Sequence, residues 1–280
     1  MIDLDDLVRG ANGIDPLPDS ALRVARILGA DDWQIEEVTG VINLDPTLTA
    51  RVLRAANSAA YSNAARNVTR VEQAVMRIGS GMLATLVVAP AVRGALRSAG
   101  ARALSRELWE HSVAASLAAD LLRLFASVPI PVEAPTAALL HDLGGIVLAL
   151  RTSQRDRLQV ERAVEMGLTL PRAEREVLGV DHAEVGALVA QRWEFPFTLV
   201  EAVRTHHDSG EAAESARVLS DVVAVADASA GAINVDGGEG PVDEAEAALP
   251  AARLGLDKSS VGELRDLLKE RLAEVLSVYE

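Results

Sequence analysis

The 280-residue sequence contains no cysteine and very few aromatic residues. Without cysteine there can be no disulfide, no thiolate nucleophile and no cysteine-based zinc site, and this composition fits a reducing cytosol. Aromatic residues make up 3% of the chain but hydrophobic residues 49%, so the core must be built from Ala, Leu and Val. Such residues favour tight helix packing, and Ala has the highest helix propensity. We therefore expect an all-α protein.

Basic residues and long apolar runs are also scarce. The 27 basic residues are outnumbered by 41 acidic ones, and the resulting net charge of −14 disfavours non-specific binding of nucleic acid. A small anionic ligand remains compatible with that charge where a metal ion or a local basic cluster offsets it. The acidic start of the chain does not resemble a signal peptide, and no uncharged run reaches the ~18 apolar residues of a membrane span. We expect a cytoplasmic protein that does not enter a membrane.

Turn signals and apolar periodicity divide the chain into three predicted parts. They are an N-terminal helical part (1–100), a second helical part (101–230) and a C-terminal part (231–280). Within them we predict an acidic loop over 234–246 and an amphipathic helix over 260–279 that packs onto the body, onto a partner helix or across a dimer seam. The other expected helices cover about 20–28, 33–42, 46–56, 69–78, 81–92, 105–125, 136–151, 153–166, 169–178, 182–193, 196–207 and 219–228.

All five histidines of the chain fall in the second part, and carboxylates accompany them. The histidines are His111, His141, His182, His206 and His207. Neutral imidazoles are common ligands of transition metals, and carboxylates complete such sites.

Three acidic residues are candidates for that role. Glu107 lies four residues before His111, on the same helical face. Asp142 and Asp227 stand in apolar surroundings, where a buried charge is costly unless it is paired or binds a cation. Buried His–Asp pairs that stabilise helix crossings without a metal are the alternative.

Several segments resemble the HDOD domain of bacterial signalling proteins, a branch of the HD superfamily. The resemblance covers about residues 10–230 and includes the H…HD…D order of the superfamily. The segments that carry it are Leu17-Pro18, 45–61 with Asn57-Ser58, 71–79, 108–112, 139–144, Asp181-His182 to Gly186, and His206-His207. It implies a helical fold and a regulatory role, because HDOD domains have no established hydrolase activity. The related HD-GYP domains degrade cyclic di-GMP with two or three metal ions.

The resemblance also implies a role for each candidate ligand. His111, His141, Asp142 and Asp227 correspond to the core metal quartet. The additional ligands correspond to Glu107, His182, His206 and His207. The implied cofactor is one or two divalent ions of Fe, Mn, Zn or Ni. Two departures argue against efficient diester hydrolysis: Gly145 stands where HD-GYP domains have lysine, and the Gly-Tyr-Pro signature is absent.

The N-terminal part offers weaker candidates for a ligand or partner site, namely Asn57 and Arg54. Asn57 ends a helical pattern, a position that asparagine favours for structural reasons. Arg54 could form a basic face with Arg51, Arg66 and Arg70. The alternative is that these arginines simply lie on a solvated helix face.

These observations favour a signalling module that binds a protein partner or a nucleotide and has no robust catalysis. A homodimer through the C-terminal helix is a further expectation. The alternative function is a metal-dependent phosphohydrolase acting on a nucleotide or a cyclic dinucleotide such as cyclic di-GMP. A purely structural helical scaffold would leave the histidine set unexplained.

Overall fold

The computed structural model describes residues 18–30, 33–58, 61, 68–98, 104–233 and 244–278. Within these ranges the side chains of 91–98, 104–107, 150, 244–246, 274 and 277–278 are outside the description. The regular elements of the described chain are helices, which confirms the all-α fold.

In the described ranges, three 3-10 turns lie between the α-helices. The helices are α2 (Asp19–Leu28), α3 (Ile35–Asn43), α4 (Pro46–Ala56), α5 (Val71–Ser98), α6 (Leu104–Leu121), α7 (Ala134–Leu140), α8 (Leu143–Arg151), α9 (Gln154–Glu165), α10 (Leu170–Leu178), α11 (His182–Arg192), α12 (Phe197–Thr205), α13 (Arg217–Gly231), α14 (Glu244–Arg253) and α15 (Lys258–Val278). The 3-10 turns are η2 (Leu122–Leu124), η3 (Ser209–Glu211) and η4 (Glu214–Ala216).

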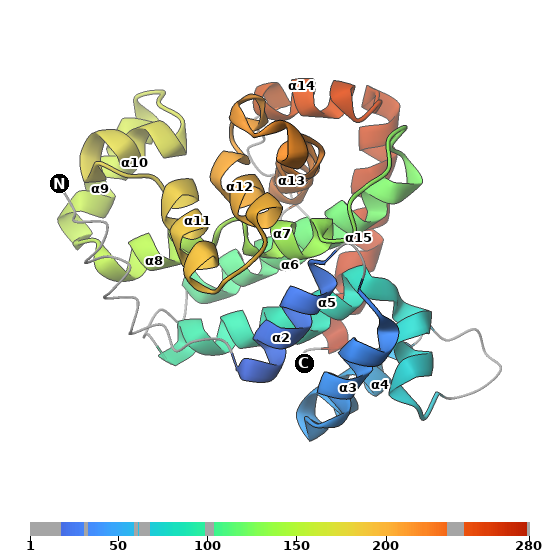
Figure 1. Cartoon of the computed structure of the whole chain (residues 1–280). Helices are drawn as coiled ribbons and strands as arrows, with labels where there is room; N and C mark the ends of the chain where they lie inside the picture. The colour runs from blue at the N-terminus through green and yellow to red at the C-terminus, as the bar shows by residue number, and fades with distance from the viewer. Residues whose placement is uncertain are drawn as a thin grey trace.

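The helices form two groups that meet at α5 (Figure 1). Helices α2, α3 and α4 pack against α5, which also contacts α6 and α7 of the second group. Helix α13 lies against α6, α7 and α12, while α11 contacts α8 and α12. One continuous apolar core extends from Ala21 to Val275. The predicted boundary near residue 100 falls at 99–103, outside the described residues, so that division stays a prediction.

Helix α4 begins with a side-chain cap. The Asp45 side chain accepts hydrogen bonds from the backbone N–H groups of Thr47 and Leu48, and Pro46 is the first residue of α4. Asn57 follows α4, where its amide donates to the carbonyl oxygen of Val68 at 2.8 Å and accepts from the Val68 N–H at 2.7 Å. These two hydrogen bonds hold the backbone of Val68 against the end of α4, which is a structural role for Asn57.

The expected break between 78 and 81 is present within α5, where Gly79 has non-helical backbone angles (φ 76°, ψ 170°) and divides the element into two helical stretches. Two other predicted elements differ from the observed ones. The helix expected over 136–151 is two helices, because the chain turns at His141 and Asp142. The predicted acidic loop is wrong for 244–246, which begin α14, and its residues 234–243 lie outside the described chain.

Helix α5 contains the one stretch of the described residues that is long and apolar enough to cross a membrane. This stretch is Val71–Pro90, and 67% of its most apolar window is buried inside the protein. Its apolar composition is explained by burial against α2, α3, α4, α6 and α7, because a helix in a protein core can be as long and as apolar as a membrane span.

The C-terminal helix α15 packs onto the body of the protein. Its apolar residues Leu264, Leu268, Leu272 and Val275 are buried, and the helix contacts α6 and α13. Of the three arrangements predicted for this helix, packing onto the body of the protein is therefore the one observed for its apolar face.

A close crossing of α8 and α11 brings distant ligand residues together. A β-carbon added at Gly144 would lie 1.9 Å from the carbonyl oxygen of His182 and 2.5 Å from the backbone nitrogen of Gly186. A β-carbon at the next residue, Gly145, would meet only the His182 β-carbon, at an ordinary 3.9 Å. Gly144 is thus required for the approach that places His182 beside the turn at Asp142.

The two neighbouring glycines predict opposite effects on stability. Gly144→Ala should lower the free energy of unfolding by at least about 3 kcal/mol, because backbone atoms of α11 would have to move. Gly145→Ala should raise it by a few tenths to about 1 kcal/mol through helix propensity. Urea denaturation of the two variants measures both effects, and equal destabilisation would contradict this account of the crossing.

Candidate metal centre

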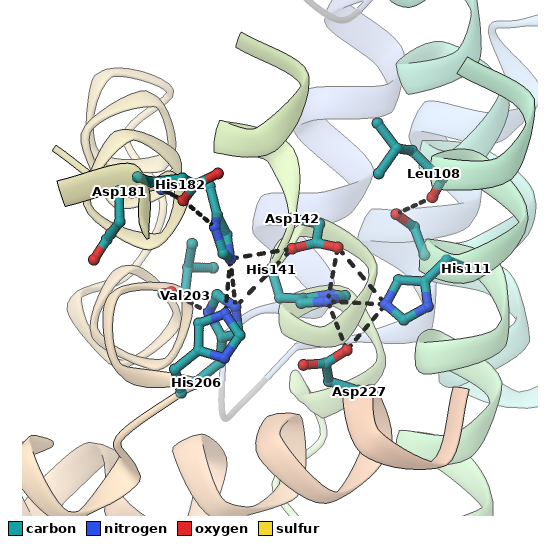
Figure 2. A network of polar contacts seen from close by, with 12 residues as sticks. Leu108, His111, His141, Asp142, Asp181, His182, Val203, His206 and Asp227 are labelled. Carbon is teal, nitrogen blue, oxygen red and sulfur yellow. Dashed lines mark hydrogen bonds and ion pairs between the residues drawn. The ribbon is translucent and has the colours of Figure 1, made fainter. Parts of the chain in front are cut away.

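Seven ligand-type side chains from five places in the fold converge on one site (Figure 2). They come from α6, the turn between α7 and α8, the first turn of α11, the residues after α12, and α13. In that order they are His111; His141 and Asp142; His182; His206 and His207; and Asp227. The structure thus brings together all of the predicted histidines and two of the three predicted carboxylates.

The first cluster contains His111, His141, Asp142 and Asp227. Nε2 of His111 lies 3.3 Å from Nε2 of His141 and 3.0 Å from Oδ1 of Asp227. Nε2 of His141 lies 3.4 Å from the same Asp227 oxygen. Oδ2 of Asp142 lies 3.6 Å from His111 Nε2 and 3.4 Å from His141 Nε2. Two imidazoles and two carboxylates therefore share one small volume.

The second cluster contains His182, His206 and His207. Nε2 of His182 lies 3.3 Å from Nε2 of His206 and 2.7 Å from Nε2 of His207. The other oxygen of Asp142, Oδ1, lies 3.5 Å from Nε2 of His182 and 4.0 Å from Nε2 of His206. Asp142 thus faces the first cluster with one oxygen and the second with the other, as Figure 2 shows.

The three buried imidazoles are oriented by their outer nitrogens. Nδ1 of His141 lies 2.7 Å from the Ala138 carbonyl oxygen, and Nδ1 of His206 lies 2.7 Å from that of Val203. Nδ1 of His182 lies 2.6 Å from Oε2 of Glu174. Because these oxygens only accept, each Nδ1 carries a proton and each ring turns its Nε2 into the site, where a neutral ring presents a lone pair.

This donor set fits divalent metal ions. When the rings are neutral, lone pairs of neighbouring imidazoles face one another and the Asp142 carboxylate, an arrangement that is repulsive unless protons or metal ions lie among them. Imidazole and carboxylate ligands suit ions such as Zn²⁺, Fe²⁺ and Ni²⁺. The two clusters with Asp142 between them would hold a pair of ions, of which the first would also bind Asp227.

The electrostatics of the site agree with this donor set. Burial alone would lower the pKa of His141, but Asp142 and Asp227 outweigh it and raise the pKa well above its ordinary value. Burial also opposes charge on His182, yet Glu174, Asp142 and Asp181 raise its pKa to about 9.

The pKa values of Asp142, Asp227 and His206 are shifted by the imidazoles around them. Burial would raise the pKa of Asp142 and of Asp227, but the imidazoles around them hold both well below the ordinary value. Burial and the neighbouring imidazoles lower the pKa of His206. The ionised carboxylates are thus balanced by protons on His141 and His182, a task that a bound cation would take over with release of those protons.

The residues of the centre differ in their exposure to solvent. The side chains of His141 and His206 are fully buried and that of His182 is 3% exposed. His111, Asp142 and Asp227 are 23%, 20% and 24% exposed. Solvent therefore reaches these three residues, whereas the buried histidines are covered by the surrounding helices.

The remaining predicted residues do not join this constellation in the described structure. Glu107 is in α6, but its side chain lies outside the described residues. Asn57 and the exposed Arg54 belong to the end of the molecule formed by α3 and α4, away from α11 to α13 in Figure 1. Glu174, which contacts His182, was not predicted, because nothing in the sequence of α10 distinguishes it from other helical glutamates.

Comparison with known proteins identifies the family. The HDOD domain matches residues 14–209, which is more than half of the chain. The chain belongs to the HDOD family. An HDOD domain protein of unknown function from Geobacter sulfurreducens is 29% identical, with a TM-score of 0.74 and 97% of each chain covered.

Two further similar proteins carry less specific names. A Shewanella amazonensis protein named "Putative phosphohydrolase" is 26% identical, with a TM-score of 0.64 and coverage of 97% of this chain and 96% of that chain. An uncharacterized protein of Treponema pallidum is 26% identical over 214 residues, which are 76% of this chain and 41% of that protein. The HDOD chain thus spans less than half the length of this relative.

The shared position of Asp142 predicts unequal effects of the two carboxylates on metal binding. Asp142→Ala should weaken both ions, because each cluster loses an oxygen ligand. Asp227→Ala should weaken one ion only. Elemental analysis of reconstituted protein, made without a histidine tag, measures the number of ions per chain.

Asp208→Ala serves as the matched control, since Asp208 is exposed and accepts a hydrogen bond from the Gly210 N–H beside the histidines. It should bind the same number of ions as the wild type. Equal losses for Asp227→Ala and Asp208→Ala would show that Asp227 is not the final carboxylate of the site.

Proposed function

We propose that this HDOD protein is a metal-binding signalling module of the bacterial cytoplasm, whose dinuclear centre supports the recognition of a nucleotide or a protein partner. The observation that carries the proposal is the position of Asp142, with one oxygen toward each histidine cluster. A carboxylate in this place links the clusters into one unit. Binding at the centre would thereby act on every helix that supplies a ligand.

The composition of the site supports recognition of an anionic group. The chain as a whole carries a charge of −14, which opposes the approach of phosphates. Two divalent ions would reverse the local charge beside His111, Asp142 and Asp227, whose side chains are partly exposed. A phosphate or a carboxylate is therefore the ligand chemistry that the centre would recognise.

The residue at position 145 argues against rapid turnover. Gly145 follows Asp142 by three residues and lies next to His182. It has no side chain with which to bind a transferring phosphoryl group or to move a proton. Charge stabilisation at the reacting group is often the largest contribution to catalysis, so its loss favours binding over reaction.

A second function, phosphodiester hydrolysis, is favoured by the completeness of the ligand set. Both clusters retain their imidazoles, and the Shewanella amazonensis relative is named "Putative phosphohydrolase". Two divalent ions supply Lewis acidity and activate water when bound. The residues of the chain would hold the ions, with Asp142 fixing their separation and the buried histidines fixing the orientation.

Metal loading followed by activity measurement separates the two functions. We expect about two ions per chain after reconstitution with Fe²⁺ or Mn²⁺, as for a site with two sets of ligands. We further expect binding of cyclic di-GMP or another nucleotide, or of a partner, without turnover of cyclic di-GMP or bis(p-nitrophenyl) phosphate. His141→Ala is the control that should remove metal from the first cluster.

The possible outcomes decide between the proposals. Two ions with no turnover support the signalling module. Two ions with diester hydrolysis that disappears in His141→Ala and Asp142→Ala would establish the second function instead. Less than about 0.2 ion per chain under all loading conditions would overturn both, since each depends on a bound metal.

A further inference from the structure

Glu174 is a buried acidic residue that contacts one of the candidate ligands. Its exposed fraction is 7%, and it lies in α10, before the turn that leads into α11. Oε2 of Glu174 accepts hydrogen bonds from two groups of His182, the backbone N–H at 2.9 Å and the imidazole Nδ1–H at 2.6 Å. Within the described residues, the ion pair of Glu174 is formed with the imidazole of His182.

The connection between α10 and α11 produces this contact. Gly179 ends α10 with a φ of 85°, a left-handed conformation that reverses the chain direction at little cost for glycine. Asp181 then caps α11 by accepting from the Glu184 N–H, and it pairs with Arg175 of α10 at 2.6 Å. The first residue of α11, His182, is thereby turned back toward Glu174.

The contact distinguishes His182 from the other two buried histidines. His141 and His206 place their Nδ1–H groups on the backbone carbonyl oxygens of Ala138 and Val203, whereas His182 places its own on a carboxylate. A carboxylate accepts a stronger hydrogen bond than a neutral carbonyl and draws the Nδ1 proton toward itself. Electron density at Nε2 increases, and the imidazole becomes a better donor to a cation.

We propose that Glu174 is a positioning residue of the second cluster, which fixes the ring and tautomer of His182 and strengthens it as a metal ligand. This inference rests on the proposed metal binding. Burial of a carboxylate is costly unless it is well bonded, and both hydrogen bonds that Glu174 accepts come from His182. Its charge is therefore directed at one ligand and is not spread over a surface network.

Substitution of Glu174 should affect one ion selectively. Glu174→Ala should weaken the ion of the second cluster by about 10- to 100-fold, because the ring loses its orienting acceptor. Glu174→Gln should lie between this variant and the wild type, since an amide oxygen can accept both bonds but carries no charge. Titration of the metal-free protein with Co²⁺, followed by calorimetry and by the visible absorption of the bound ion, measures both affinities.

Glu176→Gln is the matched control, because Glu176 is an exposed glutamate on the same helix. It should bind both ions as the wild type does. A second control combines Glu174→Ala with His182→Ala: if Glu174 acts through His182, the double variant should bind no more weakly than His182→Ala alone. Urea denaturation without metal shows whether each variant is folded.

A purely structural role for Glu174 predicts a different pattern. Glu174→Ala would then lower the free energy of unfolding but leave the Co²⁺ affinities and the absorption spectrum unchanged, which would overturn the inference. A two-dimensional ¹⁵N–¹H spectrum of the imidazoles of metal-free Glu174→Gln adds an independent readout, in which His182 should keep its Nδ1 proton. If the wild type binds no ion, the proposed function fails; if it binds two and the Glu174 variants match it, only the role of Glu174 fails.

Discussion

The Asp142 carboxylate, shared between two groups of imidazoles, is the interaction on which the site depends. Its Oδ2 faces His111 and His141, and its Oδ1 faces His182 and His206. Four rings crowded around one anion would repel it and one another if each were neutral and turned its lone pair inward. Protons or metal ions must therefore balance the group, and the number of cations in the site is tied to its geometry.

This convergence requires an unusually close approach of helix backbones. The missing side chain at Gly144 lets α8 contact the carbonyl oxygen of His182, and a turn between α7 and α8 directs His141 and Asp142 into the same volume. A core of Ala, Leu and Val allows such short distances, because these side chains keep the helices near to one another. The scarcity of aromatic residues thus serves the packing that builds the centre.

Ligand types and many helix positions could be predicted from the sequence, because they depend on residue identity or on short spacing. Histidines beside carboxylates indicate a metal centre, and apolar periodicity predicts helices over 46–56 and 182–193, close to the observed α4 and α11. The break at His141 and Asp142 could not be predicted, since the apolar run through Leu143 contains no breaker. The contact of Glu174 with His182 was also hidden, because it depends on a left-handed turn at Gly179 and on burial, neither of which a periodic pattern encodes.

The part of the chain that follows the family match also supplies and supports residues of the candidate metal centre. The HDOD match ends at residue 209, yet α13 supplies Asp227, and α14 holds α13 through Arg253. The Arg253 guanidinium donates to both oxygens of the buried Asp221 and, at 2.7 Å, to the hydroxyl of Ser209, two residues after His207. Burial strengthens such a bidentate pair and makes the loss of either partner costly. One arginine therefore links the helix of a first-cluster ligand to the loop that follows two second-cluster ligands, so the C-terminal helices belong to the framework that sets the distance between the clusters.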